Sequence, residues 1–403
     1  LTLKKTIKYN IYMERREILK AGMILTGGLL GSALYGCENS ISKNEELKIK
    51  PKQTAVYEIS SPLPFDYEMI DKMANLNDSL KKSKIVSFYN SIPYPLAKNL
   101  EDFQPSRGEN RNIKSFKDFI KYVDYAKNKG FDFSYTLNSP KPFLESEFKQ
   151  NENYLYNLLD KLLESNIKKL KIANTQLLSI LADKYPEFEI SASTSFEYRN
   201  IEQYVNLFEN YPNIKMIDVA LDENRNFKFL KALKKMFPKV KIELMANESC
   251  LYGCPARISH PGGMYCVYDC EKVMKKLDFV HICKARIIYP WDLPYYSAIG
   301  INNFKFMLGK RADIKIKALK FFRNYLRIVD NGVEKYTAEE FLGEIFKFSH
   351  NFNLNKKVTL KEAKKYFPDI NFFVENGHKC AYECGIGCRY CYDCAQKLKE
   401  ILS

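Results

Sequence analysis

Residues 155–192, LYNLLDKLLESNIKKLKIANTQLLSILADKYPEFEISA, contain one repeat of the pattern that decides the fold. The first part has leucines at the spacing of an amphipathic helix: Leu155, Leu158, Leu159, Leu162 and Leu163. That helix is expected to end near Asn166. Two short apolar runs, residues 170–173 and 188–192, are typical of buried strands, with a second helical stretch between them. The stretch therefore predicts strands that alternate with helices.

The same alternation continues on both sides of this stretch. Eight short runs rich in β-branched or aromatic residues are the expected strands: residues 85–89, 131–137, 170–173, 188–192, 216–221, 240–246, 279–283 and 304–308. Eight strand–helix repeats over about 250 residues match a (β/α)8 TIM-like barrel of the α/β class. A doubly wound sheet is the alternative, but it usually has fewer strands and a glycine fingerprint that is absent here.

Polar residues follow these expected strands. In a barrel the reacting groups lie at the carboxyl ends of the strands. We expect Asn138, Asn174 and Glu248 to bind substrate there, because each directly follows an apolar run. Together with Arg286 and Arg311, they predict a polar, partly cationic mouth.

Composition limits the possible classes of protein. The chain has 403 residues, 46% of them hydrophobic, which is enough for one large domain with an appendage. Its net charge is +15, from 63 Lys and Arg against 48 Asp and Glu. This charge is compatible with a nucleic acid or anionic lipid partner, but a lysine-rich solvated surface explains it equally simply. No stretch indicates a protein with several membrane spans.

Eleven cysteines are concentrated in two groups, and Cys37 stands alone near the N-terminus. The first group has two Cys-x3-Cys pairs directly after an expected strand, and it consists of Cys250, Cys254, Cys266 and Cys270. Four thiolates that converge on one small volume can ligate a 4Fe–4S cluster. Structural zinc is the main competitor, and disulfides are the third option. Cys283 lies inside an expected strand and is interpreted as a core residue.

The second group reads CAYECGIGCRYCYDC over residues 380–394, with Cys380, Cys384, Cys388, Cys391 and Cys394. Such density favours metal ligation over simple packing of thiols. A second 4Fe–4S cluster, or a cap over the first, is expected. The spacing Cys384-x3-Cys388-x2-Cys391 also matches a radical S-adenosylmethionine triad, although that triad normally follows the first strand of a barrel.

The N-terminus has the features of an export signal. Residues 13–37 read MERREILKAGMILTGGLLGSALYGC, with Arg15 and Arg16 before a weakly apolar stretch that ends at Cys37. This pattern is similar to a twin-arginine signal with a lipoprotein processing site. It predicts an extracytoplasmic, lipid-anchored protein, and the alternatives are an N-terminal helix packed on the body and a cytoplasmic location.

The expected organisation has four parts. Residues 1–37 are the export signal, and residues 38–80 are a tether and lead-in. Residues 81–330 are the barrel with the first cysteine group. Residues 331–403 are a small helical extension that carries the second cysteine group.

Three segments resemble the peptidase U32 (collagenase-like) family and its iron–sulfur barrel relatives. They are residues 135–138 (YTLN), 247–260 (NESCLYGCPARISH) and 286–296 (RIIYPWDLPYY), the last continuing through 300–305 (GINNFK) to 309–311 (GKR). The resemblance covers about residues 84–325. It implies a 4Fe–4S barrel enzyme for oxygen-independent hydroxylation of transfer RNA, ribosomal RNA or a quinone precursor.

By the same resemblance, Cys250, Cys254, Cys266 and Cys270 would be cluster ligands. The residues implied as catalytic or pocket-lining are His260, Arg257, Arg286, Asp292, Lys305 and Arg311. The chain departs from the family in its Cys-x3-Cys first pair and in its export signal, since an exported protein does not meet cytosolic RNA. The prediction is therefore a redox or hydroxylating iron–sulfur enzyme that acts on an anionic or aromatic substrate and needs an electron donor. The alternatives are a protease, an electron-transfer or binding module, and a non-standard radical S-adenosylmethionine enzyme.

Overall fold

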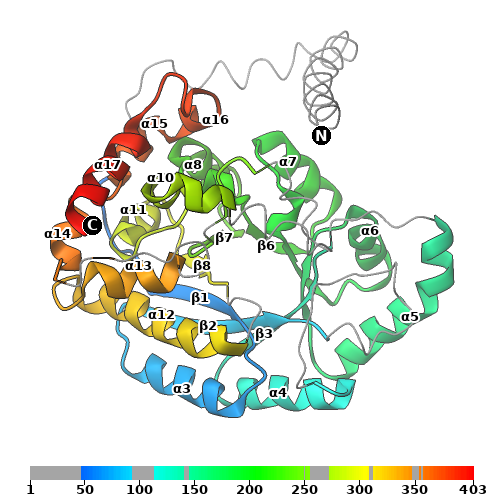
Figure 1. Cartoon of the computed structure of the whole chain (residues 1–403). Coiled ribbons are helices and arrows are strands. Elements are labelled where there is room, and N and C mark those ends of the chain that lie inside the picture. Colours follow the sequence, from blue (N-terminus) through cyan, green and yellow to red (C-terminus); the bar gives the residue numbers. More distant parts are fainter. Residues whose placement is uncertain are drawn as a thin grey trace, which may run out of the picture. The chain divides into compact units, whose positions relative to one another are not determined.

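Eight parallel strands close into a barrel in chain order, and the last strand pairs with the first (Figure 1). The strands are β1 Tyr57–Pro62, β2 Ser83–Asn90, β3 Asp132–Leu137, β4 Lys169–Ile172, β5 Glu189–Ala192, β6 Ile214–Asp218, β7 Lys241–Met245 and β8 Asn303–Lys305. The predicted (β/α)8 TIM-like fold is confirmed. The computed structural model describes residues 47–92, 113–139, 145–248, 250–254, 272–307, 312–346, 354 and 357–403.

Helices surround the barrel (Figure 1). Those that follow the strands are α3 Tyr67–Asp78, α4 Phe116–Asn128, α5 Glu145–Glu164, α6 Thr175–Lys184, α7 Ile201–Asn210, α8 Phe227–Met236, α10 Phe279–Lys284, α11 Leu293–Ala298 and α12 Ala312–Asn331. Several begin at a side chain that accepts a hydrogen bond from the first turn, such as Asp66 for α3 and Ser115 for α4. The sequence thus specifies these helix starts locally.

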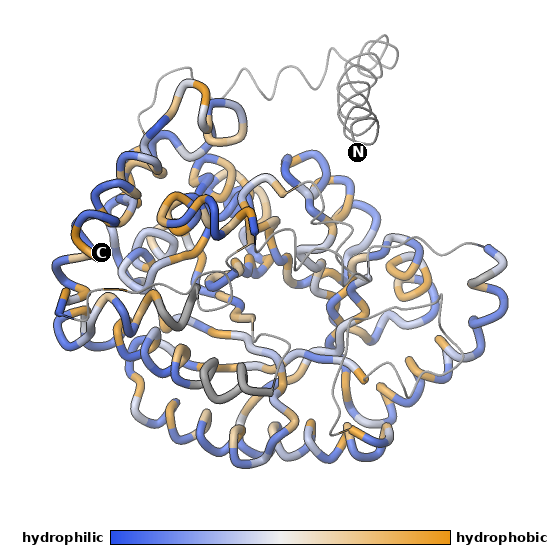
Figure 2. Tube along the Cα trace, in the orientation of Figure 1, coloured by the Kyte–Doolittle hydropathy of each residue, from blue (hydrophilic) through white to orange (hydrophobic). Residues whose placement is uncertain are grey.

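Hydrophobic and hydrophilic residues alternate along the outer helices (Figure 2), and many of the apolar residues are buried. Phe119 of α4, for example, packs edge-on against Phe133 and Tyr135 of β3, with ring centroids 5.6 Å apart in both pairs. Charged residues stay on the opposite face of α4. Burial of the apolar face is the main stabilisation of such helices.

A C-terminal extension follows α12 and continues the same compact unit as the barrel. It contains α13 Ala338–Phe346, α14 Leu360–Lys364, α15 Ile370–Asn376, α16 Cys380–Glu383 and α17 Tyr390–Leu402, and the 3-10 turn η6 Gly377–Lys379 joins α15 to α16. Helices α15–α17 lie beside α8 and α10 (Figure 1). The extension therefore lies against helices that follow β6 and β7.

One strand of the barrel was missed, and one expected strand was wrong. Residues 57–62, assigned to the tether and lead-in, form β1, so the barrel begins at Tyr57 instead of residue 81. Residues 279–283, expected as a strand, form helix α10. A six-residue apolar segment cannot be assigned to helix or strand by periodicity, because one and a half helical turns show no clear repeat.

The predicted export signal lies outside the described residues. Among the residues that the structure does describe, no helix has the length and apolar character needed to cross a membrane. The export signal and the anchor at Cys37 therefore stay predictions.

Candidate functional site

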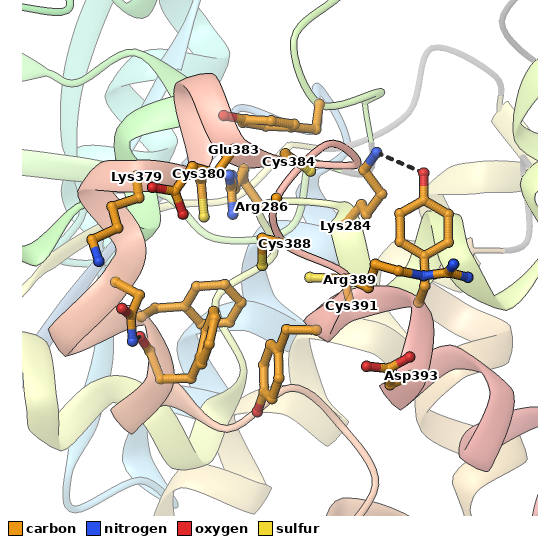
Figure 3. A pocket seen from close by; sticks show the side chains of 17 residues that line it. Lys284, Arg286, Lys379, Cys380, Glu383, Cys384, Cys388, Arg389, Cys391 and Asp393 are labelled. Atoms are coloured by element: carbon orange, nitrogen blue, oxygen red, sulfur yellow. Dashed lines mark hydrogen bonds between the residues drawn. The ribbon is translucent and has the colours of Figure 1, made fainter.

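Four cysteines of the second group line one cavity of about 360 Å³ (Figure 3). They are Cys380, Cys384, Cys388 and Cys391. In the close-up their sulfur atoms surround one space, with the guanidinium of Arg286 beside Cys380. The remaining lining residues are Tyr252, Lys284, Phe372, Phe373, Asn376, Lys379, Glu383, Gly387, Arg389, Tyr390, Tyr392 and Asp393. We call this cavity the cysteine pocket.

A tight loop between α16 and α17 brings these cysteines together. The backbone N–H groups of Gly385 and Cys388 donate to the carbonyl oxygens of Cys388 (3.0 Å) and Glu383 (2.9 Å). Gly385 has φ of +80°, a conformation that side-chain-bearing residues rarely adopt. The glycine between Cys384 and Cys388 therefore allows the chain to return so that both thiols face one cavity.

Cys394, predicted as a ligand, does not line the cysteine pocket. It follows Cys391 by three residues on α17, and its side chain is hydrogen-bonded to Tyr390. Cys283 is fully buried in α10, next to Cys391 and Cys394. Burial, followed by these two thiols, raises the pKa of Cys283 well above its usual value. Cys283 is thus a core residue as predicted, although in a helix.

Arg286 closes one side of the pocket. It is buried, and its guanidinium carbon lies 3.9 Å from the ring centroid of Tyr252. Burial alone would lower the pKa of Arg286, but its contacts with Cys380 and Tyr252, including a hydrogen bond to each side chain, outweigh burial and raise it. The predicted pocket residue Arg286 is therefore a permanent cation beside one of the four thiols.

A second buried arginine, Arg225, joins the extension to the barrel. It is the last residue of the turn η3 Leu221–Arg225 that follows β6. Its Nη1 and Nη2 donate to the carbonyl oxygens of Cys283 (2.9 Å) and Ile287 (3.1 Å). Its guanidinium carbon also lies 4.6 Å from the ring centroid of Phe373 in α15. One side chain thus connects η3, α10 and α15.

Electrostatics of the cysteine pocket suit a centre with several thiolates. Burial raises the pKa of Cys391 to about 12, although Arg225 and Arg286 oppose this shift. Such a thiol becomes a thiolate when a metal replaces its proton. The cationic lining side chains are Lys284, Arg286, Lys379 and Arg389, and the anionic ones are Glu383 and Asp393. Two positive charges remain, which offset the roughly two negative charges of an oxidised 4Fe–4S cluster with four thiolates.

The four thiols therefore fit a cluster by number, enclosure and charge. Among the described residues, no three His, Cys, Asp or Glu side chains are close enough to share a single metal ion. A 4Fe–4S cluster places each thiolate on a different iron atom, so its ligands stand further apart than those of one ion.

Only part of the first cysteine group lies within the described residues. Cys250 is half-buried and Cys254 is buried on the segment after β7, while Cys266, Cys270, Arg257, His260 and Arg311 lie outside the described residues. Tyr252, between the two described cysteines, lines the cysteine pocket. The segment 250–254 therefore reaches the second cysteine group, and the expectation that the extension caps the first group stays a prediction.

Lys305, predicted to line the pocket, lies instead in a buried charge network inside the barrel. Its Nζ is 2.7 Å from Asp218, and Nζ of Lys171 is 2.9 Å from Asp218 and 2.6 Å from Glu243. These side chains come from β8, β6, β4 and β7. Burial opposes charging of Asp218, but Lys171 and Lys305 hold its pKa well below the usual value. Sequence reasoning missed the other three residues, because lone charges in apolar runs gave no sign that they would meet.

The remaining predicted residues lie apart from the cysteine pocket. Asn174 caps α6 by accepting a hydrogen bond from the Leu177 N–H (3.1 Å). Asp292 is buried in the turn η5 Pro290–Asp292, and burial raises its pKa to about 7. Oδ1 of Asn138 is buried without a hydrogen-bond partner in the described part of the chain. Glu248 contributes, after burial and two other carboxylates, to the raised pKa of Tyr89.

One known protein is similar to this chain over more than half of its length. No protein-family model matches the chain. The uncharacterized protease MJ1657 of Methanocaldococcus jannaschii is 21% identical over 268 residues, which cover 62% of this chain and 76% of that protein. The chain is similar to the U32 peptidases. The predicted family resemblance is confirmed at this level.

Solved structures similar to this chain include the U32 peptidase Mk0906, with a TM-score of 0.42 and 10% identity over 68% of this chain and 98% of the other. The spore coat polysaccharide biosynthesis protein spsE of Bacillus subtilis has a TM-score of 0.34 and 13% identity, over 75% and 78% of the two chains. The carboxyl transferase domain of Rhizobium etli pyruvate carboxylase has a TM-score of 0.35 and 9% identity, over 82% and 54%. These likenesses carry no functional information.

Proposed function

We propose that this U32 relative is an iron–sulfur enzyme whose 4Fe–4S cluster is held in the cysteine pocket. The observation that carries the proposal is the enclosure of four thiols in one cavity with two net positive charges. The ligands would be Cys380, Cys384, Cys388 and Cys391. When bound, such a cluster supplies electrons or a Lewis-acidic iron.

The side chains around the thiols have separate roles in this proposal. Arg286 stabilises the negative charge of the thiolates and orients Cys380 through a hydrogen bond. The stacked rings of Phe372 and Tyr390, with centroids 3.8 Å apart, form an apolar wall of the cavity. Positive charge near the thiolates is one of the means by which proteins set the reduction potential of a cluster.

The reaction we propose is oxygen-independent hydroxylation or related redox chemistry on an anionic or aromatic substrate. The family resemblance supports this reaction class, and the cationic and aromatic lining of the cysteine pocket supports the substrate class. The first cysteine group, with Cys250 and Cys254, remains a proposed second set of ligands. Its other members lie outside the described residues.

Metal analysis of anaerobically purified protein tests the cluster. We expect the cysteine pocket to contribute about four iron and four sulfide per chain, and an electron paramagnetic resonance signal after reduction. Cys388→Ser should lose this iron, whereas Cys394→Ser, outside the pocket lining, should keep it. Zinc without iron in the wild-type protein would contradict the proposal.

A protease is the second candidate, because the curated relative is named a protease. This candidate predicts that the purified protein cleaves peptides and continues to do so after iron is removed by a chelator. A redox enzyme loses its turnover under the same treatment. Peptide cleavage that is independent of iron would therefore favour the protease.

We further propose that the chain is exported by a twin-arginine signal and anchored through a lipid on Cys37. Twin-arginine export carries folded proteins, which suits a chain that must bind its cluster before crossing the membrane. Fractionation of cells should find the wild-type protein with the membrane and Cys37→Ser in the soluble fraction. A nucleic acid substrate becomes reasonable only if both remain in the cytoplasm.

A further inference from the structure

Two large apolar side chains stand out from the surface at the cysteine loop. Ile386 is 88% exposed and Tyr382 is 70% exposed, whereas Met236, the next most exposed large hydrophobic residue in the described part of the chain, is 49% exposed. Single exposed apolar residues are common on protein surfaces. Two large apolar side chains that are this exposed and only four residues apart form an unusual surface.

Both residues lie on the segment that carries three of the four pocket cysteines. Tyr382 is in α16, and Ile386 is at the tip of the loop from Cys384 to Cys388. The hydrogen bonds of Gly385 and Cys388 hold this loop in a fixed turn. The turn that directs the thiols inward therefore directs Ile386 into solvent, on the outer side of the cysteine pocket.

Charge around this surface is mainly positive. Lys379 and Arg389 are exposed on either side of the loop, and Glu383 is the exposed carboxylate between them. The chain as a whole carries a net charge of +15. Such a field attracts an acidic partner over a distance comparable to the Debye length.

We propose that Ile386 and Tyr382 form the docking surface for a small acidic carrier of the ferredoxin type, working in the same compartment as the chain, that delivers electrons to the cysteine pocket. The inference rests on the proposed function, since it requires a cluster in that pocket. One electron leaves the reduced ferredoxin and enters the oxidised cluster, and no bond is formed or broken. The contact places the carrier directly over the loop of the ligands, which gives the electron a short path.

An anionic membrane surface is the competing occupant, because isoleucine and tyrosine beside lysine also suit a lipid interface. The position of the patch favours the electron carrier. A membrane contact has no need to be on the ligand loop, whereas transfer of an electron between two proteins depends on the approach of their redox centres.

Binding of an oxidised plant-type [2Fe–2S] ferredoxin to the full-length, cluster-containing protein tests the proposal by calorimetry. Ile386→Glu and Tyr382→Glu should each weaken the affinity at least tenfold, because they add a negative charge and remove apolar contact. Val56→Glu is the matched control, since Val56 is 42% exposed before β1 and away from the cysteine loop. It should change the affinity less than twofold, and added salt should weaken the wild-type complex.

A rapid-mixing experiment with reduced ferredoxin gives the second readout. Ile386→Glu should slow the reduction of the cluster by ferredoxin about tenfold and leave its reduction by dithionite unchanged. The proposal is overturned if Ile386→Glu and Val56→Glu bind ferredoxin with equal affinity. It is also overturned if Ile386→Glu loses binding to phosphatidylglycerol vesicles but keeps its binding to ferredoxin, because this result assigns the patch to a membrane. Iron content is measured first: absence of iron overturns the proposed function itself, whereas iron without ferredoxin binding overturns only the docking surface.

Discussion

The backbone carbonyl oxygen of Arg225 occupies the space that a Cβ atom on Gly377 would need. Gly377 begins the turn η6, and Arg225 ends the turn η3 after β6. The backbone of the extension therefore lies directly on the backbone of the barrel at this point. Only a residue without a side chain permits this approach, although φ of Gly377 is ordinary.

Gly377→Ala should destabilise the protein by about 1–3 kcal/mol, the usual cost of overpacking a buried site. The methyl group would meet backbone, which cannot rotate away as a side chain can. Urea unfolding measures the effect. Gly387→Ala is the control, because its nearest neighbours would be 4.0 Å away and its stability should change by less than about 1 kcal/mol. Equal stability of both variants would show that the extension does not rest on Arg225.

Asp292→Asn should flatten the dependence of stability on pH between about pH 4 and pH 7. Burial raises the pKa of Asp292 to about 7, so the folded protein binds a proton that the unfolded chain has lost above pH 4. Stability from this group is complete below pH 4 and decreases as pH rises through 7, by about 4 kcal/mol at most. Unfolding at several pH values tests this, with the exposed Glu375→Gln as control. If stability depends on pH with the same slope in Asp292→Asn and in the wild type, the raised pKa of Asp292 is contradicted.

Lys171→Met should cost about 3–5 kcal/mol of stability, because it leaves Glu243 and Asp218 buried with one fewer cation. Lys169→Met is a close control, two residues earlier on β4. Its ion pair with Asp132 is 41% and 46% exposed at the two side chains and should contribute about 0–1 kcal/mol. Chemical denaturation separates the two values. Similar losses for both would mean that the network inside the barrel is no stronger than a surface pair.

Arg286→Met should lower the reduction potential of the proposed cluster by about 60 mV, a tenfold change in a one-electron equilibrium. The buried cation stabilises the reduced cluster, which carries the greater negative charge. A redox titration followed by electron paramagnetic resonance measures the shift. Lys379→Met serves as control, because the Lys379 side chain is exposed and its charge is screened by water and salt. An unchanged potential in Arg286→Met would separate this arginine from the cluster.

The barrel could be predicted from the sequence because most of its strands are short apolar runs between amphipathic helices. The predicted number of eight strands was right because two errors cancelled: one strand was missed and one helix was counted as a strand. β1 was missed, since Ser60 and Ser61 interrupt its apolar pattern and Pro62 resembles a loop signal. Helix α10 was taken for a strand, because it is covered on most sides and so lacks a polar face. In both cases tertiary surroundings removed the periodicity on which a local prediction depends.

The sequence indicated which type of residue would form the site, but not which of these residues would come together. Cysteine spacing indicated a metal centre, yet it could not choose four of the five C-terminal cysteines, because that choice depends on the turn at Gly385. Arg225 gave no signal, since its partners are backbone carbonyls of Cys283 and Ile287, about 60 residues later. Contacts of this kind depend on the folded chain and leave no local pattern.

The order of the chain has a consequence for assembly. A ribosome makes Lys305, in the last strand, 86 residues before Cys391, an interval of about 4–17 s at ordinary rates of synthesis. The barrel can close during that interval, before the cysteines that line the pocket have all been synthesised. The backbone of Arg225, against which Gly377 packs, is then already in place when the cysteine segment emerges. Loading of the proposed cluster would therefore follow closure of the barrel and would report that the barrel beneath the pocket has folded.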